Sequence, residues 1–274
     1  MPIYCPIEPR ERSRDEYHDL DYRVMAIVFR VHNEFGNLWD EKIYREEIVG
    51  RCAKTGLCVQ QEVPIRVSHG DFVKIYLMDW VVDNSIVYEL KTAEAFSADH
   101  RKQILNYLFL SRCCWGKLVN MRSPSVTSEF IASSFTPEER RQFEVHADDW
   151  RDLNPDSHWL RQLIMDLLQD WGTLLDLQLF YDAIAYFRGG EDCLIKPIPV
   201  LCNGQFLSTQ KGPLLTPDIA VRLSAVKNDV KHPNSVRSYE SHLRRFLSHT
   251  TLQAIHWINF NRQEISMKTI MRQS

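Results

Sequence analysis

The sequence lacks features that mark membrane proteins, secreted proteins, disulfide-rich proteins and strongly basic proteins. None of its hydrophobic runs approaches the roughly 18 apolar residues of a membrane-spanning helix, and the charged start of the chain lacks the apolar stretch of a signal peptide. Its seven cysteines include no C-x-x-C pair, which argues against a disulfide framework. Basic charge is not in excess, because 33 Lys and Arg face 36 Asp and Glu. We therefore expect a cytoplasmic protein without a membrane partner, in which any nucleic-acid contact comes from a local patch.

What remains is ordinary globular composition, with 44% hydrophobic and 25% charged residues in 274 positions, enough for one large or two small domains. Apolar spacing predicts helices over residues 22–34 and 38–50. The stretch 56–94 is rich in β-branched and aromatic residues and has two turn signals, which predicts a three-strand meander. A helix over 97–112, with Ser97 as its N-cap, and a strand near residue 120 follow.

The second half of the chain resembles the first. Residues 136–156 are polar and begin with the helix-start pattern Thr136-Pro137-Glu138-Glu139, which predicts a helical linker between domains at 1–135 and 157–274. Four collinear matches at offsets of 134 to 139 link the halves: IYREEI with FYDAIA, VPIRVSHGDF with IPVLCNGQF, QILNYL with HLRRFL, and GKLVNM with IHWINF. They predict two copies of one α/β unit, an intramolecular pseudo-dimer.

The first copy contains the residues with the clearest chemical potential. Glu89 and Lys91 lie two apart in an expected strand and so share a face. If Asp83-Asn84-Ser85 is a three-residue turn, Asp79 lies opposite Glu89, with Cβ atoms roughly 5 Å apart. Two carboxylates placed in this way suit a hard cation such as Mg²⁺ or Mn²⁺. Lys91 would then orient the attacking water or help to deprotonate it.

Two helices supply further candidates. Gln103 and Tyr107 are four residues apart and share a helical face, from which they could steady a phosphate or the nucleophile. Glu41 and Tyr44 are three apart on the second opening helix, and Glu41 could add a third carboxylate to the metal site. The alternative is that both tyrosines are core aromatics with satisfied hydroxyls.

An E-x-K tripeptide on its own is more often a solvated ion pair than a catalytic element. Here the flanking segments, SIVYEL and IYLMDWVV, are apolar. Charged side chains inside apolar strands are costly unless they are paired or bind a metal. The surroundings therefore favour a functional site.

These residues resemble a known family. The stretches FGNLWDEKIYREEI, QQEVPIRV, VYELKTAEAF and HRKQILNYLFL, with Asp79 between the second and third, are similar to the GxxExxY proteins of the PD-(D/E)XK nuclease superfamily over residues of about 22–125. The resemblance implies a restriction-endonuclease-like fold, with a mixed central sheet flanked by helices. It assigns Glu41 and Tyr44 to the family's E and Y. One departure is that Leu38 stands where the motif has glycine, with Gly36 nearby.

The same resemblance assigns Asp79, Glu89 and Lys91 to the nuclease core. It assigns Gln103 and Tyr107 to the Q-x-x-x-Y element of RecB-like and lambda-exonuclease-like nucleases.

The second copy does not repeat this set. An offset of 134 aligns Asp79, Glu89 and Lys91 with Pro213, Leu223 and Ala225. Residues 205–274 carry ten Lys or Arg and four acids, a net charge of +6. A solvated basic face explains most of these, and phosphate contact is the alternative. The candidates for phosphate contact are Arg237, Arg244 and Arg245.

The sequence thus predicts two PD-(D/E)XK-like α/β domains, the second without the catalytic set, and a metal-dependent nuclease acting on DNA or RNA. The first alternative is a nucleic-acid-binding or scaffold protein that keeps the fold without cleaving. The second is a pseudo-dimer serving a partner protein, which would expose an apolar groove.

Overall fold

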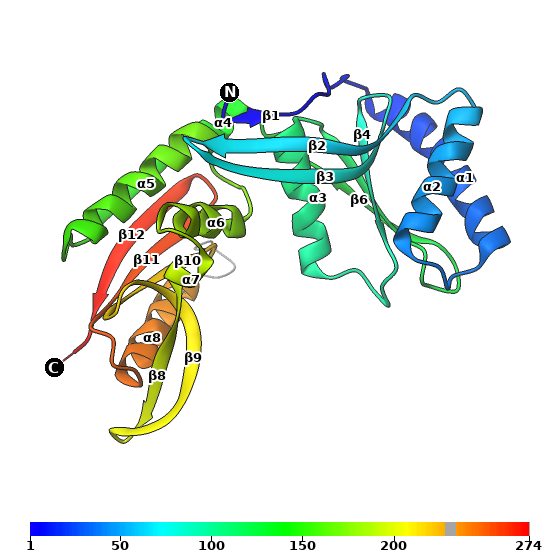
Figure 1. Cartoon of the computed structure of the whole chain (residues 1–274). Helices are drawn as coiled ribbons and strands as arrows, with labels where there is room; N and C mark the ends of the chain where they lie inside the picture. Colours follow the sequence, from blue (N-terminus) through cyan, green and yellow to red (C-terminus); the bar gives the residue numbers. More distant parts are fainter. Residues whose placement is uncertain (228–233, 274) are drawn as a thin grey trace. The chain divides into compact units, whose positions relative to one another are not determined.

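The computed structural model describes residues 1–227 and 234–273, and it divides into two compact units, Met1–Pro137 and Glu138–Ser274. Each unit contains one six-stranded mixed sheet with helices against it (Figure 1). The predicted fold class, mixed α/β in both halves, is therefore confirmed. None of the helices among the described residues is both long enough and apolar enough to cross a membrane.

The first unit begins with two helices and continues as the predicted meander. Its elements are β1 (Ile3–Tyr4), α1 (Arg14–Phe35), α2 (Glu41–Lys54), β2 (Val59–His69), β3 (Phe72–Val82), β4 (Ile86–Lys91), α3 (Ala98–Ser111), β5 (Trp115–Asn120) and β6 (Thr127–Ala132). The strands are ordered β1-β2-β3-β4-β5-β6. Only the β4–β5 pair is parallel, because α3 provides the crossover that a parallel pair requires.

Local signals fix the helix ends. Ser13 and Glu16 form a capping box at the start of α1, and the helix ends at Gly36, whose φ of 72° suits glycine. Ser97 caps α3 as predicted, with its hydroxyl accepting from the amide of His100 at 3.2 Å. The start of α3 was therefore predicted, whereas α1 begins at Arg14, eight residues before the predicted start at 22, because the Ser13 cap was not recognised.

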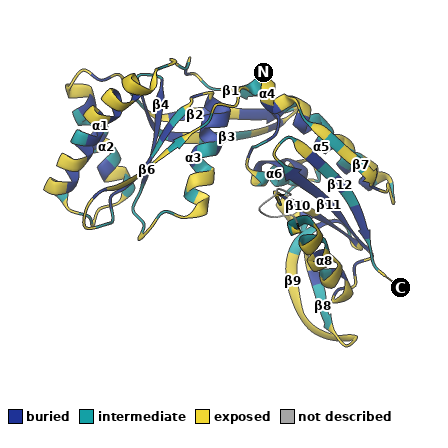
Figure 2. Ribbon diagram, turned by 180° about the vertical axis from the view of Figure 1, so that it is seen from behind, coloured by how far each residue is buried: buried dark blue, intermediate teal, exposed yellow. Residues whose placement is uncertain are grey.

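The two faces of β4 meet different helices. Tyr88 and Leu90 belong to a buried cluster that includes Val28 of α1 and Ile48 of α2. Glu89 and Lys91 alternate with these residues and so point to the other face, where α3 lies (Figure 1). Nearly all of β4 is buried (Figure 2). The α3 face of β4 therefore carries charge in an interior position.

The second unit follows the same general plan. Its elements are α4 (Pro137–Arg141), β7 (Glu144–Asp149), α5 (Pro155–Trp171), α6 (Leu177–Phe187), α7 (Glu191–Leu194), β8 (Ile195–Cys202), β9 (Gln205–Thr216), β10 (Ile219–Ser224), α8 (Ser235–Ser248), β11 (Ala254–Asn261) and β12 (Glu264–Met271). The strands are ordered β7-β12-β11-β10-β9-β8.

The stretch 136–156 differs from the helical linker that its sequence led us to expect. It contains α4, β7 and the start of α5, and β7 pairs in parallel with β12 at the edge of the second sheet. Within it, the side chain of Arg140 is buried and donates to the carbonyls of Trp171 and Thr173. The sequence of β7, EVHADD, is polar because an edge strand with one covered face needs few apolar residues.

The series β2 to β6 and the series β8 to β12 have the same neighbours and the same directions. In each series the third of the four strand pairs is parallel and the other three are antiparallel. Helices precede each series, α1 and α2 in one unit and α5, α6 and the four-residue α7 in the other, and a helix joins the parallel pair of each series.

The parallel pairs also fix which residues correspond. Lys91 pairs with Asn120 in the first unit, and Ser224 pairs with Asn259 in the second. The offset for β4 is therefore 133, not 134, so Glu89 corresponds to Arg222 rather than Leu223. The cause is the turn before β10, which has two residues where the turn before β4 has three, with a register shift between Ile219 and Ala220.

The same offset corrects the other two alignments. Lys91 corresponds to Ser224 rather than Ala225. Extending the Ala220–Leu214 pairing by two residues places Gly212, rather than Pro213, at the position of Asp79. Neither replacement is a carboxylate or a lysine.

Candidate active site

The candidate site lies where β3 and β4 separate, at the carboxyl end of β4. Residues Asp83–Ser85 form the three-residue turn assumed from the sequence, and Val82 pairs with Ile86 and Trp80 with Tyr88. The next residues in this register are Asp79 and Glu89. The backbone pairing of β3 with β4 ends at this point. The Leu90 amide donates instead to the side chain of Asp79, at 2.8 Å.

Asp79 is also paired with a cation from α2. Its Oδ1 accepts from Arg45 Nη1 at 2.9 Å, and the side chain of Asp79 is 16% exposed. The other arm of the Arg45 guanidinium bonds Glu62 at 2.7 Å. Arg45 thus holds Asp79 from one side while the Leu90 amide holds it from the other.

Glu89 is the most deeply buried acid of the group. Only 2% of its surface is exposed, and Lys91 Nζ donates to its Oε1 at 2.7 Å. Its Oε2 is buried and has no hydrogen-bond partner among the described residues. Burial first, and then the charges of Asp79 and Glu41, raise the pKa of Glu89 to about 8 although Lys91 acts in the opposite direction.

Glu41 is the first residue of α2, and its Oε1 accepts from the amide of Thr92 at 3.0 Å. This contact brings α2 to the end of β4, one residue beyond Lys91. Tyr44 is fully buried, and its hydroxyl donates to the carbonyl of Gly36 at 2.7 Å and accepts from the amide of Trp39. Tyr44 therefore fixes the loop that precedes Glu41.

Helix α3 supplies two polar groups to the same face of β4. Gln103 Nε2 donates to the Tyr107 hydroxyl at 3.0 Å. Burial raises the pKa of Tyr107 to about 12, and the charges of Glu89 and Asp79 act in the same direction. The hydroxyl of Tyr107 thus lies within electrostatic range of both carboxylates and stays protonated at neutral pH.

Arg45 is a site residue that the sequence analysis missed. Arg45 lies four residues after Glu41, which puts the two side chains on one helical face, and this spacing could have indicated it. Asn120 is a second such residue, which the sequence analysis included only within the match of GKLVNM to IHWINF. It is buried, its Nδ2 donates to the Ala93 carbonyl at 2.6 Å, and its Oδ1 accepts from the Ala93 amide at 3.3 Å. It fixes the backbone two residues after Lys91.

Whether these residues suit a divalent metal can be tested on their contacts. Among residues 1–227 and 234–273, no set of three or more His, Cys, Asp or Glu side chains is close enough to form a ready-made metal centre. Asp79 and Glu89 are nevertheless two hard carboxylates at one point, and Glu89 Oε2 lacks a partner in the described part of the chain. A cation there would stabilise the charged form of Glu89, so the pair fits a metal with few protein ligands.

The basic residues proposed for phosphate contact lie on α8. Arg237 and Arg245 are exposed, and Arg245 Nε contacts the carbonyl of Ser241 at 3.5 Å. Arg244 is paired with Glu240 at 2.7 Å. Lys231, counted in the basic excess, lies outside the described residues.

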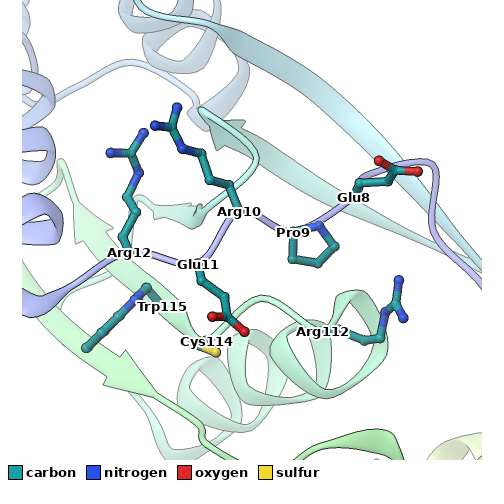
Figure 3. Close-up of a pocket in the computed structure, with 8 residues that line it drawn as sticks. All are labelled: Glu8, Pro9, Arg10, Glu11, Arg12, Arg112, Cys114 and Trp115. Atoms are coloured by element: carbon teal, nitrogen blue, oxygen red, sulfur yellow. The ribbon is translucent and has the colours of Figure 1, made fainter.

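A cavity of about 540 Å³ occurs elsewhere in the first unit, between residues 8–12 and the start of β5 (Figure 3). Trp115 lines it at the amino end of β5, whereas Asn120 marks the carboxyl end, roughly 17 Å away at 3.3 Å per residue. Its charges are mixed, with Glu8 and Glu11 beside arginines. This cavity is separate from the candidate site.

One comparison with known protein families finds a match in the first unit. Residues 18–131 match the PD-(D/E)XK nuclease superfamily. The matched range contains Glu41, Asp79, Glu89, Lys91 and the Gln103–Tyr107 pair. The match thus lies within the first unit, and divalent metals are general in the superfamily that it resembles.

Two further comparisons add little. One solved structure, the crystal structure of SSO0001, has 19% sequence identity over 41% of this chain and 67% of that chain, with a TM-score of 0.25. That score is too low to support an argument. No curated protein matches the sequence.

Proposed function

We propose that the first unit is a metal-dependent nuclease that hydrolyses phosphodiester bonds in DNA or RNA. Glu89 carries the proposal. It is a carboxylate with 2% of its surface exposed and one oxygen without a partner among the described residues, next to Asp79 and Lys91. Leaving such an oxygen buried and unbonded is costly, and a bound cation would offset that cost. The superfamily match over residues 18–131 supports the same function.

Asp79 and Glu89 would hold the metal, Mg²⁺ or Mn²⁺, with Glu41 as a third ligand after release of the Thr92 amide. All three offer the carboxylate oxygens that these ions prefer. When bound, the metal supplies Lewis-acid activation of the scissile phosphate.

The remaining residues orient the reactants. Lys91 Nζ carries three N–H donors, and a water placed against it could pass a proton to bulk solvent while the lysine holds the resulting negative charge. The Tyr107 hydroxyl and the Gln103 amide are donors suited to phosphate oxygens. Asn120 would keep the segment after Lys91 in place through both polar groups of Ala93.

Two finer assignments belong to this proposal. The first is membership of the GxxExxY group, for which the bond between the Tyr44 hydroxyl and the Gly36 carbonyl is support, since it gives a tyrosine and a glycine a joint role before Glu41. In this chain the glycine precedes Glu41 by five residues rather than three.

The second is that the second unit is a degenerate copy of the first. The shared strand order and directions support it, and so do Asn120 and Asn259, which occupy the last paired position of β5 and β11 in the two parallel ladders. Arg222 and Ser224 replace Glu89 and Lys91, so this unit would not cleave. Arg237, Arg244 and Arg245 stay predicted contacts to a nucleic-acid backbone.

The experiment is cleavage of labelled single- and double-stranded DNA and RNA by the full chain, with Mg²⁺ or Mn²⁺ and with EDTA. Glu89→Gln and Lys91→Ala should each lower the cleavage rate by at least about 100-fold. The matched controls are Glu94→Gln, an exposed acid after β4, and Lys102→Ala, whose side chain is 72% exposed on α3. Both controls should cleave like the parent.

A binding or scaffold protein is the alternative, and one observation favours it. Arg45 and Lys91 already neutralise Asp79 and Glu89, so the carboxylates have partners without a metal. Titration calorimetry with Mn²⁺ separates the two. Saturable binding that is lost in Glu89→Gln supports the nuclease, whereas no binding and no cleavage of any substrate supports the scaffold.

A further inference from the structure

The second unit has a cavity at the place that corresponds to the candidate active site. Its volume is about 260 Å³. It lies between β9, β10 and α8, and its lining residues include Gly212 and Arg222, the counterparts of Asp79 and Glu89. The position has thus stayed open to ligands although its residues have changed.

The charged residues of this cavity are basic, whereas the corresponding place in the first unit, the candidate active site, contains the acids Asp79 and Glu89. Lys211, Arg222 and His242 line it, and none of its lining residues, all within the described part of the chain, is acidic. Among the described residues, Lys211 and Arg222 make no ion pair. Arg222 Nε donates to the Tyr239 hydroxyl at 3.0 Å, which orients the guanidinium and leaves its other N–H donors available.

One backbone amide donates to an acid in the first unit and to a neutral group in the second. In the first unit the Leu90 amide donates to the carboxylate of Asp79. Its counterpart, the Leu223 amide, donates at 2.7 Å to the hydroxyl of Tyr181 on α6. A neutral acceptor has replaced the acid, so no lining residue of the cavity competes with an anion for Arg222.

The other walls of the cavity are apolar. Phe246, Leu243, Ile198 and Ile255 line it, and the ring of Tyr239 packs on Trp257 with centroids 5.4 Å apart. Three cationic or hydrogen-bonding side chains beside an aromatic wall are the combination that recognises a phosphate attached to a planar base.

We propose that this cavity binds the phosphate group of a nucleotide, with Arg222 and Lys211 on the phosphate and the Phe246 and Tyr239 wall against the sugar or base. The nucleotide is either free or the phosphorylated end of a nucleic-acid strand. The proposal concerns the second unit alone and stands whether or not the first unit cleaves.

The test is titration calorimetry of the full chain in EDTA, which removes any metal from the first unit. The probes are inorganic phosphate, adenosine, adenosine monophosphate, and one oligonucleotide with and without a 5′-phosphate. The monophosphate or the phosphorylated strand should bind saturably. Tighter binding of the phosphorylated strand identifies a strand end, and tighter binding of the monophosphate identifies a free nucleotide.

The variants are Arg222→Gln and Lys211→Gln, each of which should weaken that binding at least about tenfold, since each removes a charge-assisted hydrogen bond. Lys102→Gln, which removes a charge in the first unit, should leave it unchanged. Lys211 is exposed, so its variant folds even if Arg222→Gln does not. Adenosine binding as tightly as its monophosphate, equal binding of the two oligonucleotides, or unchanged affinity in both variants would overturn the proposal.

Discussion

Asn120 and Asn259 make the same contact in the two units. Asn120 bonds both the carbonyl and the amide of Ala93, and Asn259 bonds both the carbonyl and the amide of Val226, at 2.9 and 2.7 Å. Each asparagine is the last residue of the second strand that pairs with the first in the parallel ladder, and each bonds the residue two positions beyond the first strand. The connection from β4 to α3 and that from β10 to α8 therefore begin in the same way.

Replacing either asparagine should destabilise the protein. Asn120→Ala or Asn259→Ala leaves a partly buried amide and carbonyl without their side-chain partner, at a cost of about 1 kcal/mol or more for each variant. Urea unfolding followed by circular dichroism measures this change. Asn261→Ala is the control, because Asn261 is partly exposed and its side chain bonds Glu264 on the neighbouring strand. Equal stability of all three variants would show that these bonds contribute nothing.

Glu89 should make the metal-free protein less stable as the pH rises. Its pKa is about 8 when folded, against 4.5 for the same side chain free in water, so between these values the folded state binds more protons than the unfolded state. The free energy of unfolding therefore falls from pH 4.5 to 8, by roughly 4 kcal/mol from this group. Glu89→Gln should lack that fall.

The measurement is thermal unfolding of parent and Glu89→Gln in EDTA from pH 5 to pH 8. The variant should gain stability relative to the parent as the pH rises, with most of the gain before pH 8. Glu94→Gln controls for the loss of an acid at an exposed site. A constant difference between parent and variant over this range would contradict the buried position of Glu89.

His256 should have the opposite pH dependence. It is fully buried, stacks on Trp150 with centroids 4.2 Å apart, and bonds the Ser157 hydroxyl at 2.7 Å. Burial lowers its pKa to about 4. As the pH drops, His256 is protonated first in the unfolded state, where its pKa is near 6.5. The free energy of unfolding therefore falls between pH 6.5 and pH 4, by roughly 3 kcal/mol.

In His256→Gln, the free energy of unfolding should fall less between pH 7 and pH 5 than it does in the parent, although the variant is less stable at pH 7. His146→Gln is the matched control, since His146 lies on β7 with 59% of its side chain exposed. The comparison is urea unfolding of all three proteins at pH 7 and pH 5. If the free energy of unfolding of His256→Gln fell as much from pH 7 to pH 5 as that of the parent, the pH dependence would come from other groups.

Gly172→Ala should destabilise the second unit strongly. Gly172 ends α5 with φ of 77°, and a Cβ there would lie 2.9 Å from the carbonyl oxygen of Arg140. The substitution therefore adds backbone strain to a clash with backbone, at a cost of about 2 kcal/mol or more. Gly50→Ala, in the interior of α2 with no described atom within 4 Å of the added Cβ, should instead stabilise by up to about 1 kcal/mol. Calorimetric melting of both variants tests the contrast.

Local sequence patterns were sufficient for much of the fold. The turn Asp83–Ser85 gave the register of β3 and β4, and with it the facing positions of Asp79 and Glu89, because a turn of known length fixes the pairing. The Ser97 cap placed α3, and therefore Gln103 and Tyr107, correctly.

Other features depend on contacts between distant segments. The ion pair of Arg45 with Asp79 joins residues 34 positions apart, and only tertiary packing selects Asp79 among the acids that Arg45 could reach. The sequence of β7 is polar enough to resemble a linker, because an edge strand needs few apolar residues. The one-residue error in aligning the halves arose because a two-residue turn and a register shift precede β10.

The turn Asp83–Ser85 also limits how this part of the chain can change length. Surface turns commonly tolerate insertions and deletions, but here one residue more or less would exchange the faces of β4. Glu89 and Lys91 would then point at α1 and α2, and Tyr88 and Leu90 at α3. Relatives that keep the chemistry should therefore keep nine residues between the two acids, as this chain does, even where their other loops differ in length.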